Sequence, residues 1–148
     1  MPISATADKS KLRAPGEQVP VVEGEGQDEL FASLYSTDNW IAVVGVLRSG
    51  LGLSSAEIGR GANVSQATVA RWLESDENAP VKASGRLDDL RYVVLWLIRC
   101  GMSDRLMRFW LAAKNIELGS DPLSAIAAGR FEEVIEAART FAAGRSVA

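Results

Sequence analysis

The chain has 148 residues, of which 47% are hydrophobic, and its formal net charge is −3 at pH 7. This apolar content excludes wholesale disorder, and the length allows one ordinary domain or two small domains that share a core. Histidine is absent, so the commonest general base and the commonest zinc ligand are both missing, and we expect no enzyme, no cofactor and no metal site. The single cysteine, Cys100, cannot form an internal disulfide, which predicts that the protein lies in the reducing cytoplasm.

The first segment, residues 1–27, contains several prolines and glycines and few apolar residues. It is predicted to be a disordered tail that leans acidic. No charged region followed by an apolar one opens it, so we expect no secretory signal. The longest apolar run, Tyr92 to Ile98, is too short to span a bilayer, and we expect no membrane partner.

Residues 28–78 are predicted to form the first folded region, which starts with a short helix over 28–35. A second helix runs from about Asn39 to Arg48, and Thr37-Asp38 is predicted to cap it. Its apolar residues recur on one helical face, at Trp40, Val43, Val44 and Leu47. Two glycines between Ser49 and Leu53 are predicted to end it.

The segment from Ser55 to Trp72 predicts two short helices joined by a tight turn. Apolar residues at the spacing of a helix-turn-helix can pack one helix across the other, and these are Ile58, Val64, Val69 and Trp72. Gly59 is the small residue at the close approach, Asn63 tolerates the left-handed backbone of the turn, and Ser65 is a natural N-cap. Such a unit serves mainly to place its second helix in the major groove of DNA.

Operator DNA is therefore the expected partner of this unit. From the outward side of the second helix, Gln66 can read adenine and Arg71 can contact guanine or a phosphate, and Ser54 is a further candidate phosphate contact. The predicted DNA-binding residues are Ser55, Ser65, Gln66, Ala67, Thr68, Ala70 and Arg71. The alternative that the unit binds no DNA stays open. The charges between Trp40 and Asp76 balance, and many paired helices bind only each other.

Residues 79–86 are predicted to be a polar linker between the first region and a second helical unit over 87–148. The helix that starts at Leu87 is apolar nearly all round, which is typical of a core centre or of a dimer seam. We expect a homodimer through this helix. The alternative is that helices near Trp40 and Phe131 wrap it completely within the monomer.

Cap residues and glycines mark the helix ends of the second unit. They are Gly101, Ser103, Asp121 followed by Pro122, and Gly129. The segment 114–120 is predicted to be a loop. A last helix from Arg130 to about Ala142 has one apolar stripe, formed by Phe131, Val134, Ile135, Ala138 and Phe141. No segment predicts a strand, so the expected fold class is all-α.

An ordered set of residues in the second half is similar to a family pattern. The set is Trp110-Leu111, Asn115, Leu118-Gly119, Pro122-Leu123 and Gly129, ahead of a terminal amphipathic helix. It resembles the toxin-binding domain of Xre-type antitoxins, the MbcA/ParS-like family, which places a helix-turn-helix before this domain. The resemblance covers roughly residues 39–142. Two departures are Lys114, where the family often has proline, and the one glycine after Leu118 where two are frequent.

The resemblance implies a binding protein. Antitoxins of this family neutralise RES-domain toxins, which degrade NAD, by direct contact that covers the entrance of the active site, and the helix-turn-helix represses the operon. It assigns toxin contact to Trp110, Asn115, Leu118, Gly119, Asp121, Pro122 and Arg130. For Trp110 and Pro122, core packing and helix capping are the alternative. For the whole chain, the alternatives are a stand-alone transcriptional regulator with a dimerisation domain and a helical adaptor that binds no DNA.

Overall fold

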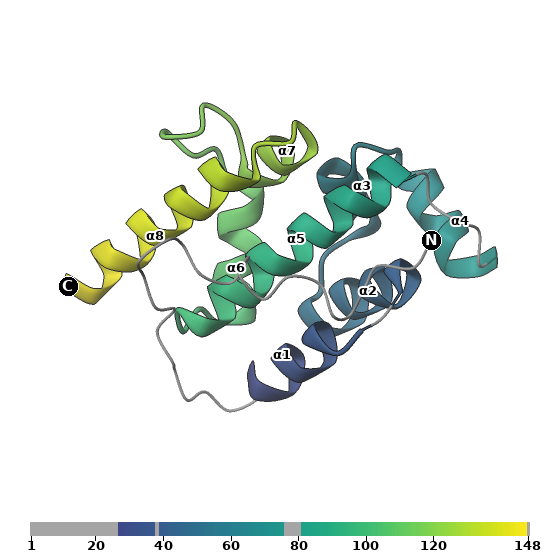
Figure 1. Cartoon of the computed structure of the whole chain (residues 1–148), viewed down its shortest axis with the longest axis horizontal. Helices are drawn as coiled ribbons and strands as arrows, with labels where there is room; N and C mark the ends of the chain where they lie inside the picture. Colours follow the sequence, from purple (N-terminus) through teal and green to yellow (C-terminus); the bar gives the residue numbers. More distant parts are fainter. Residues whose placement is uncertain (1–26, 38, 76–80, 148) are drawn as a thin grey trace.

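The computed structural model describes residues 27–37, 39–75 and 81–147, and these are mostly helical (Figure 1). In chain order the elements are α1 (Gln27–Tyr35), α2 (Trp40–Val46), the π-helical turn η2 (Leu47–Leu51), α3 (Ser55–Ala62), α4 (Gln66–Ser75), α5 (Val81–Arg99), α6 (Asp104–Ala112), α7 (Pro122–Ala127) and α8 (Phe131–Val147). Apart from an isolated bridge between Asn115 and Ser120, these residues contain no β-structure. The predicted all-α class is confirmed.

The helix α5 forms the centre of the core. Every residue from Leu90 to Ile98 is buried. Figure 1 shows α5 crossing the middle of the molecule, where it packs against α1, α2, α3, α7 and α8. The other helices therefore wrap α5 within the monomer, as in the alternative to the dimer seam. Its burial removes the apolar surface on which the homodimer expectation depended.

The start of α5 corrects the predicted linker. Residues 81–86 form the first turns of this helix, whereas 79 and 80 lie outside the described residues. Ala83 is buried in the core, and Arg86 donates from Nε to the main-chain oxygen of Ala127 in α7 at 3.3 Å. The polar segment is helical because contacts with α7 hold it. One core is continuous across both predicted units.

The cap of α2 also differs from the prediction. Asn39 is the N-cap, because its Oδ1 accepts a hydrogen bond of 2.8 Å from the main-chain N of Ala42. Thr37 instead donates from Oγ1 to the carbonyl of Ser33 at 2.5 Å, at the end of α1. Asp38 lies outside the described residues. Because the Thr37 hydroxyl is bonded to α1, it does not cap α2.

The helical segment that begins with α2 ends further along the chain than predicted. The helix continues past Arg48 through η2, which includes Gly50, and the left-handed Gly52 follows it with φ 92°. Arg108 of α6 donates from Nη1 to the carbonyl of Leu51 at 2.8 Å. This contact satisfies a carbonyl that the helix end leaves without an intrahelical partner.

The predicted caps of the second unit are confirmed. Ser103 caps α6, Asp121 caps α7 with Pro122 in its first turn, and Gly101 and Gly129 have φ of 84° and 82°. The last helix extends to Val147, beyond the predicted end at Ala142.

The N-terminal part of the chain is described only from Gln27 onward, so the predicted tail over 1–26 lies outside the described residues. Gln27 itself is helical and donates from Nε2 to Oδ1 of Asp104 at 2.8 Å, which corrects the tail boundary by one residue. Within the described ranges, no helix has the length and apolar character to cross a membrane.

Candidate functional site

Helices α3 and α4 form a two-helix unit joined by the turn 63–65, which we call the α3–α4 unit. Asn63 has φ 61° and ψ 43°, so the predicted left-handed turn residue is confirmed. A Cβ at Gly59 would lie 2.7 Å from the carbonyl oxygen of Val64, and only glycine fits there without a backbone shift. The closest approach therefore joins α3 to the turn that starts α4.

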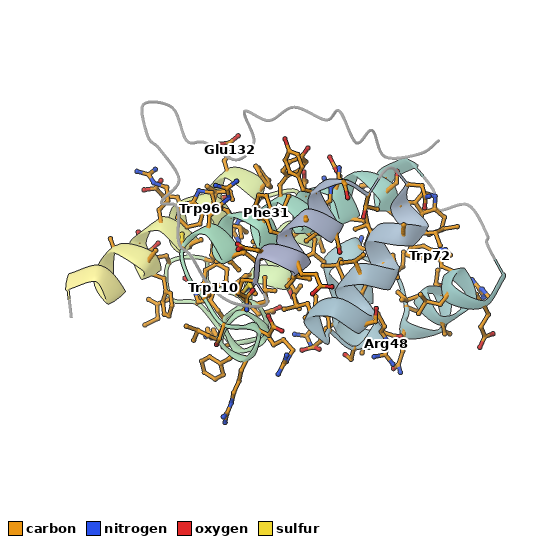
Figure 2. The ribbon with its side chains drawn as sticks, turned by 90° about the horizontal axis from the view of Figure 1, so that it is seen from below. Phe31, Arg48, Trp72, Trp96, Trp110 and Glu132 are labelled. Carbon is orange, nitrogen blue, oxygen red and sulfur yellow. The ribbon has the colours of Figure 1, made fainter. Side chains whose placement is uncertain are left out.

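The inner side of the α3–α4 unit is apolar, as its spacing predicts. Ile58 and Val69 are fully buried, Trp72 is 2% exposed, and Val64 packs against the core from a partly buried position. The ring of Trp72 meets Trp40 of α2 edge-on, with 4.9 Å between ring centroids. Figure 2 shows Trp72 toward one end of the molecule and Trp110 toward the other. This packing fixes α4 on the body of the protein.

The outer side of α4 carries most of the predicted DNA-binding residues. Exposed or half-buried positions are Gln66, Ala67, Thr68, Ala70 and Arg71. Ser65 caps the helix, because its Oγ accepts from the main-chain N of Thr68 at 3.1 Å. Arg71 donates from Nη2 to Oγ1 of Thr68 at 3.3 Å, which links its guanidinium to the cap. The structure thus brings Ser65, Thr68 and Arg71 together on one surface.

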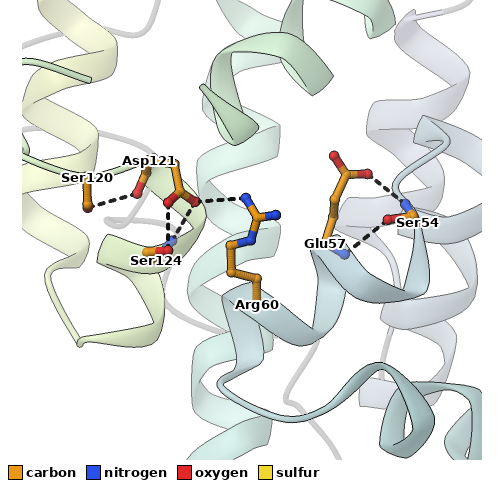
Figure 3. Close-up of polar contacts among 6 residues, drawn as sticks. All are labelled: Ser54, Glu57, Arg60, Ser120, Asp121 and Ser124. Atoms are coloured by element: carbon orange, nitrogen blue, oxygen red, sulfur yellow. Dashed lines mark hydrogen bonds and ion pairs between the residues drawn. The ribbon is translucent and has the colours of Figure 1, made fainter. Parts of the chain in front are cut away.

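The start of α3 is a reciprocal cap that the sequence reasoning missed. Ser54 Oγ accepts from the main-chain N of Glu57 at 3.1 Å, and Glu57 Oε1 accepts from the main-chain N of Ser54 at 2.9 Å (Figure 3). The Ser-x-x-Glu spacing is the signal that predicts such a box. The Glu57 carboxylate brings negative charge to the helix start, which disfavours a phosphate at Ser54 and at the half-buried Ser55.

Several arginines are engaged within the fold and leave little positive charge for DNA. Main-chain carbonyls accept from Arg86, Arg91, Arg108 and Arg130. Near the α3–α4 unit, Arg48 and Arg71 are exposed, and Arg60 pairs with Asp121. Arg48 lies at the surface on the α4 side of the molecule (Figure 2). The basic groups around α4 are therefore few.

The loop over 113–121 is ordered by Asn115. Its Oδ1 accepts from the main-chain N of Glu117 at 3.0 Å and of Leu118 at 3.3 Å. Its main-chain N donates to Ser120, and its carbonyl accepts from Gly119, whose φ is 72°. Asn115 and Gly119 thus shape the loop. A partner would meet a surface that is already formed.

Three of the residues assigned to toxin contact are buried. Trp110 and Leu118 are each 5% exposed, and Pro122 is buried at the start of α7. The Trp110 ring lies against Phe141 of α8, with 6.3 Å between centroids. The buried side chains of these three residues offer a partner little surface, in agreement with the alternative of core packing and helix capping for Trp110 and Pro122.

Arg130 connects the loop to the start of α8. Its Nη1 donates to the carbonyl of Leu118 at 2.9 Å, and Nε and Nη2 both donate to the Glu133 carboxylate. The hydrogen bond to Glu133 raises the pKa of Arg130, and the same bond lowers the pKa of Glu133. Arg130 therefore stabilises the conformation of the loop and is also a polar group beside it.

Asp121 joins the loop to the α3–α4 unit. Its carboxylate accepts from the main-chain N of Ser124 at 3.0 Å and from its Oγ at 2.7 Å, and Arg60 Nη1 lies 3.3 Å away (Figure 3). Burial raises the pKa of this carboxyl, but the hydrogen bonds from Ser124 and the nearby Arg60 outweigh that effect, so the pKa lies below 3.8.

Two exposed apolar side chains near this loop were missed. Ile116 is 96% exposed in the loop, and Phe109 is 69% exposed on α6. Phe109 lies off the apolar stripe of Met107, Trp110 and Leu111, so helical periodicity can identify it as exposed. Ile116 follows no period, and only its position between Asn115 and Glu117 in a predicted loop indicates exposure.

An open cleft of about 500 Å³ lies between the α3–α4 unit and α7. Its lining residues are Gly59, Arg60, Asn63, Val64, Ser65, Ser124, Ala127 and Ala128. It places the half-exposed guanidinium of Arg60 beside the turn that starts α4.

Among the described residues, no cluster of three or more His, Cys, Asp or Glu side chains can hold a metal ion. In comparisons with known proteins, no family model, no curated protein and no solved structure matches the chain. Its function is therefore inferred from its own residues.

Proposed function

We propose that this chain is a cytoplasmic antitoxin of a type II toxin–antitoxin system, which neutralises a RES-domain toxin by direct binding. A helix-turn-helix formed by α3 and α4 represses its operon. The observation that carries this proposal is that one continuous core supports both an outward-facing α4 and an ordered loop with the exposed Ile116. Both surfaces lie within the part of the chain that resembles the antitoxin family. Covering an active-site entrance is a binding event and requires no cofactor.

On the DNA side, the exposed residues of α4 support the proposal that it is a recognition helix. In such units the first residues of the second helix contact base edges, while the first helix crosses the phosphate backbone. Gln66 is exposed at the first position of α4, and Arg71 is exposed further along it. Because the basic groups around α4 are few, two copies on adjacent half-sites are needed for useful affinity. We therefore expect a homodimer on the operator.

Arg71→Ala tests the recognition helix. If Arg71 reads a base, its loss weakens operator binding by about 1–3 kcal/mol in a gel shift with DNA from upstream of the operon. Arg139→Ala is the matched control, because it removes the same charge from α8, which lies at the other end of the molecule from α4 (Figure 1). Equal affinity of the two variants would show that Arg71 does not read DNA.

On the toxin side, the loop offers the anchor and rim that a neutralising interface needs. Interfaces concentrate their binding energy in a central apolar anchor surrounded by polar groups. Ile116 is almost fully exposed. The exposed Lys114 and Glu117 lie near it in the sequence, and the partly exposed Arg130 donates a hydrogen bond to the same loop. The hydrogen bonds of Asn115 hold the loop in place before binding, which lowers the entropic cost of association.

Ile116→Asp tests the anchor without disturbing the core. It should weaken toxin binding by at least about 2 kcal/mol, roughly 30-fold, and abolish protection of cells that express the toxin of the adjacent gene. Ala32→Asp, on an exposed position of α1, is the control for an added surface carboxylate. Circular dichroism should be unchanged in both variants. Full protection by the folded Ile116→Asp protein would place the toxin interface elsewhere.

A second candidate is a helical adaptor that binds no DNA. The Glu57 carboxylate at the start of α3 and the capture of Arg60 by Asp121 favour it, since both reduce attraction for phosphate. Absence of operator binding by the wild-type protein, with toxin neutralisation intact, would decide for the adaptor. A stand-alone regulator would bind DNA and no toxin, so operator binding without toxin neutralisation would decide for it.

A further inference from the structure

The Arg60–Asp121 pair connects two surfaces that lie far apart in the sequence. Arg60 belongs to the last turn of α3, and Asp121 ends the loop and caps α7. Arg60 Nη1 lies 3.3 Å from Asp121 Oδ2, and the two side chains are 44% and 19% exposed. The Asp121 carboxylate is also fixed by Ser124, whereas Asp121 is the one hydrogen-bond partner of the Arg60 side chain in the described part of the chain.

The position of Arg60 is suited to a phosphate contact. It lines the open cleft together with Asn63 and Ser65, the turn residue and the cap of α4. In a helix-turn-helix complex the first helix crosses the phosphate backbone next to the start of the second. The guanidinium is half-exposed at that place, and Arg binds phosphate through several hydrogen bonds at once.

We propose that Arg60 is a DNA phosphate contact whose availability is controlled by Asp121, the residue that closes the partner-binding loop. In the free protein, the carboxylate competes with phosphate for the guanidinium. Exposed ion pairs are weak, so a phosphate can displace the carboxylate at modest cost. This inference rests on the proposed DNA-binding function and extends its interface beyond α4.

The same pair couples the two proposed sites. A partner that binds the loop and satisfies the Asp121 carboxylate releases Arg60 and strengthens operator binding. By thermodynamic reciprocity, DNA that draws Arg60 away makes Asp121 more available to the partner. The coupling requires no large movement, since α3 and α7 pack against each other and Gly61 of α3 lies beside Leu123 of α7.

The test is a double-mutant cycle on the full chain with operator DNA. Asp121→Asn removes the competing charge but keeps an efficient N-cap for α7. It should tighten binding about two- to five-fold, the range of an exposed ion pair. It should leave the slope of log K against log salt unchanged, because Arg60 contacts a phosphate in both complexes, whereas Arg60→Gln should make that slope less negative by about 0.9. In an Arg60→Gln background, Asp121→Asn should change neither quantity.

Two controls separate this proposal from simpler effects. Glu117→Gln removes a carboxylate from the exposed part of the same loop, and it should not reproduce the Arg60-dependent change. If Asp121→Asn tightens binding equally with and without Arg60, bulk charge explains the result and the proposal is wrong. If the wild-type protein binds the operator and Asp121→Asn does not change its affinity, this inference is wrong and the proposed DNA function stands. Absence of wild-type binding overturns the proposed DNA function as well.

Discussion

The α3–α4 unit and the loop over 113–121 are both ordered, but by different interactions. The α3–α4 unit is fixed by buried apolar side chains such as Trp72 and by the close approach at Gly59. The loop is fixed by polar contacts to its main chain, from Asn115 and from Arg130, and by Leu118, which is buried in the core. Ile116, in contrast, is 96% exposed. The unit thus displays the polar groups of α4 over buried apolar side chains, whereas the loop displays the apolar Ile116 beside its polar contacts.

This difference separates stability from recognition. Removing apolar surface from the α3–α4 unit should destabilise the whole protein, because one core spans both halves. Removing Ile116 should leave stability unchanged and affect only binding. The loop can therefore vary its exposed residue to suit a partner while Asn115 and Arg130 preserve its shape.

The largest effect is expected for Trp72→Ala. Trp72 is 2% exposed and packs against Trp40, so its truncation should lower the free energy of unfolding by about 3–5 kcal/mol. Urea denaturation measures this loss. Leu73→Ala is the control at the adjacent position, which is 40% exposed, and should cost about 0.5 kcal/mol or less. Similar losses for the two variants would mean that α4 is not held by the buried tryptophan.

A smaller loss is expected for Gly59→Ala. The added Cβ would lie 2.7 Å from the Val64 carbonyl oxygen, so backbone must shift, and the cost should be about 1–3 kcal/mol. At Gly85 in α5, a Cβ meets nothing within 4 Å, and Gly85→Ala should stabilise the protein by about 0.4–1 kcal/mol. Opposite signs of the two thermal shifts are the expected result. A neutral Gly59→Ala would show that the turn relaxes easily.

On the loop, Asn115→Ala should cost about 1 kcal/mol through the loss of its side-chain hydrogen bonds to Glu117 and Leu118. Asn115→Asp keeps the acceptor and should retain most of that stability. Hydrogen exchange of the Leu118 amide measures the local effect. If Asn115→Ala leaves that amide protected, the side chain of Asn115 does not hold the loop, and Arg130 is its main polar support.

Local signals predicted most of the helices and their ends. These signals depend only on residues close together in the sequence. Examples are the left-handed Asn63, the Ser65 cap and the helix start at Asp121-Pro122. Helical periodicity likewise identified the buried side of α4. The Ser54–Glu57 cap could have been found in the same way from its spacing.

Contacts between distant segments were not predictable from local patterns. Residues 81–86 look like a linker, and they are helical because Ala83 enters the core and Arg86 reaches α7. The burial of α5 depends on helices from both ends of the chain, so an apolar circumference alone could not separate a core helix from a dimer seam. The Arg60–Asp121 pair spans a sequence separation of 61 and has no local signature.

The smallest effect, and the one that joins the two regions, concerns the Asp121 carboxylate and pH. Burial raises its pKa, but Ser124 and Arg60 together hold it below 3.8 in the folded protein. A depressed folded pKa stabilises the protein above the unfolded value, and this contribution is lost as the pH falls through the folded value. Wild-type protein should therefore be more stable than Asp121→Asn from neutral pH down to about pH 5, and the difference should shrink below about pH 4.

Urea midpoints of the two proteins between about pH 7 and pH 3 measure this difference. Because an asparagine also caps a helix well, the difference reports the charge and its bonds to Ser124 and Arg60 rather than loss of the cap. A difference that stays constant down to pH 3 would contradict the depressed pKa. If Asp121→Asn is less stable near neutral pH and also binds operator more tightly, the carboxylate stabilises the free protein at the expense of DNA affinity.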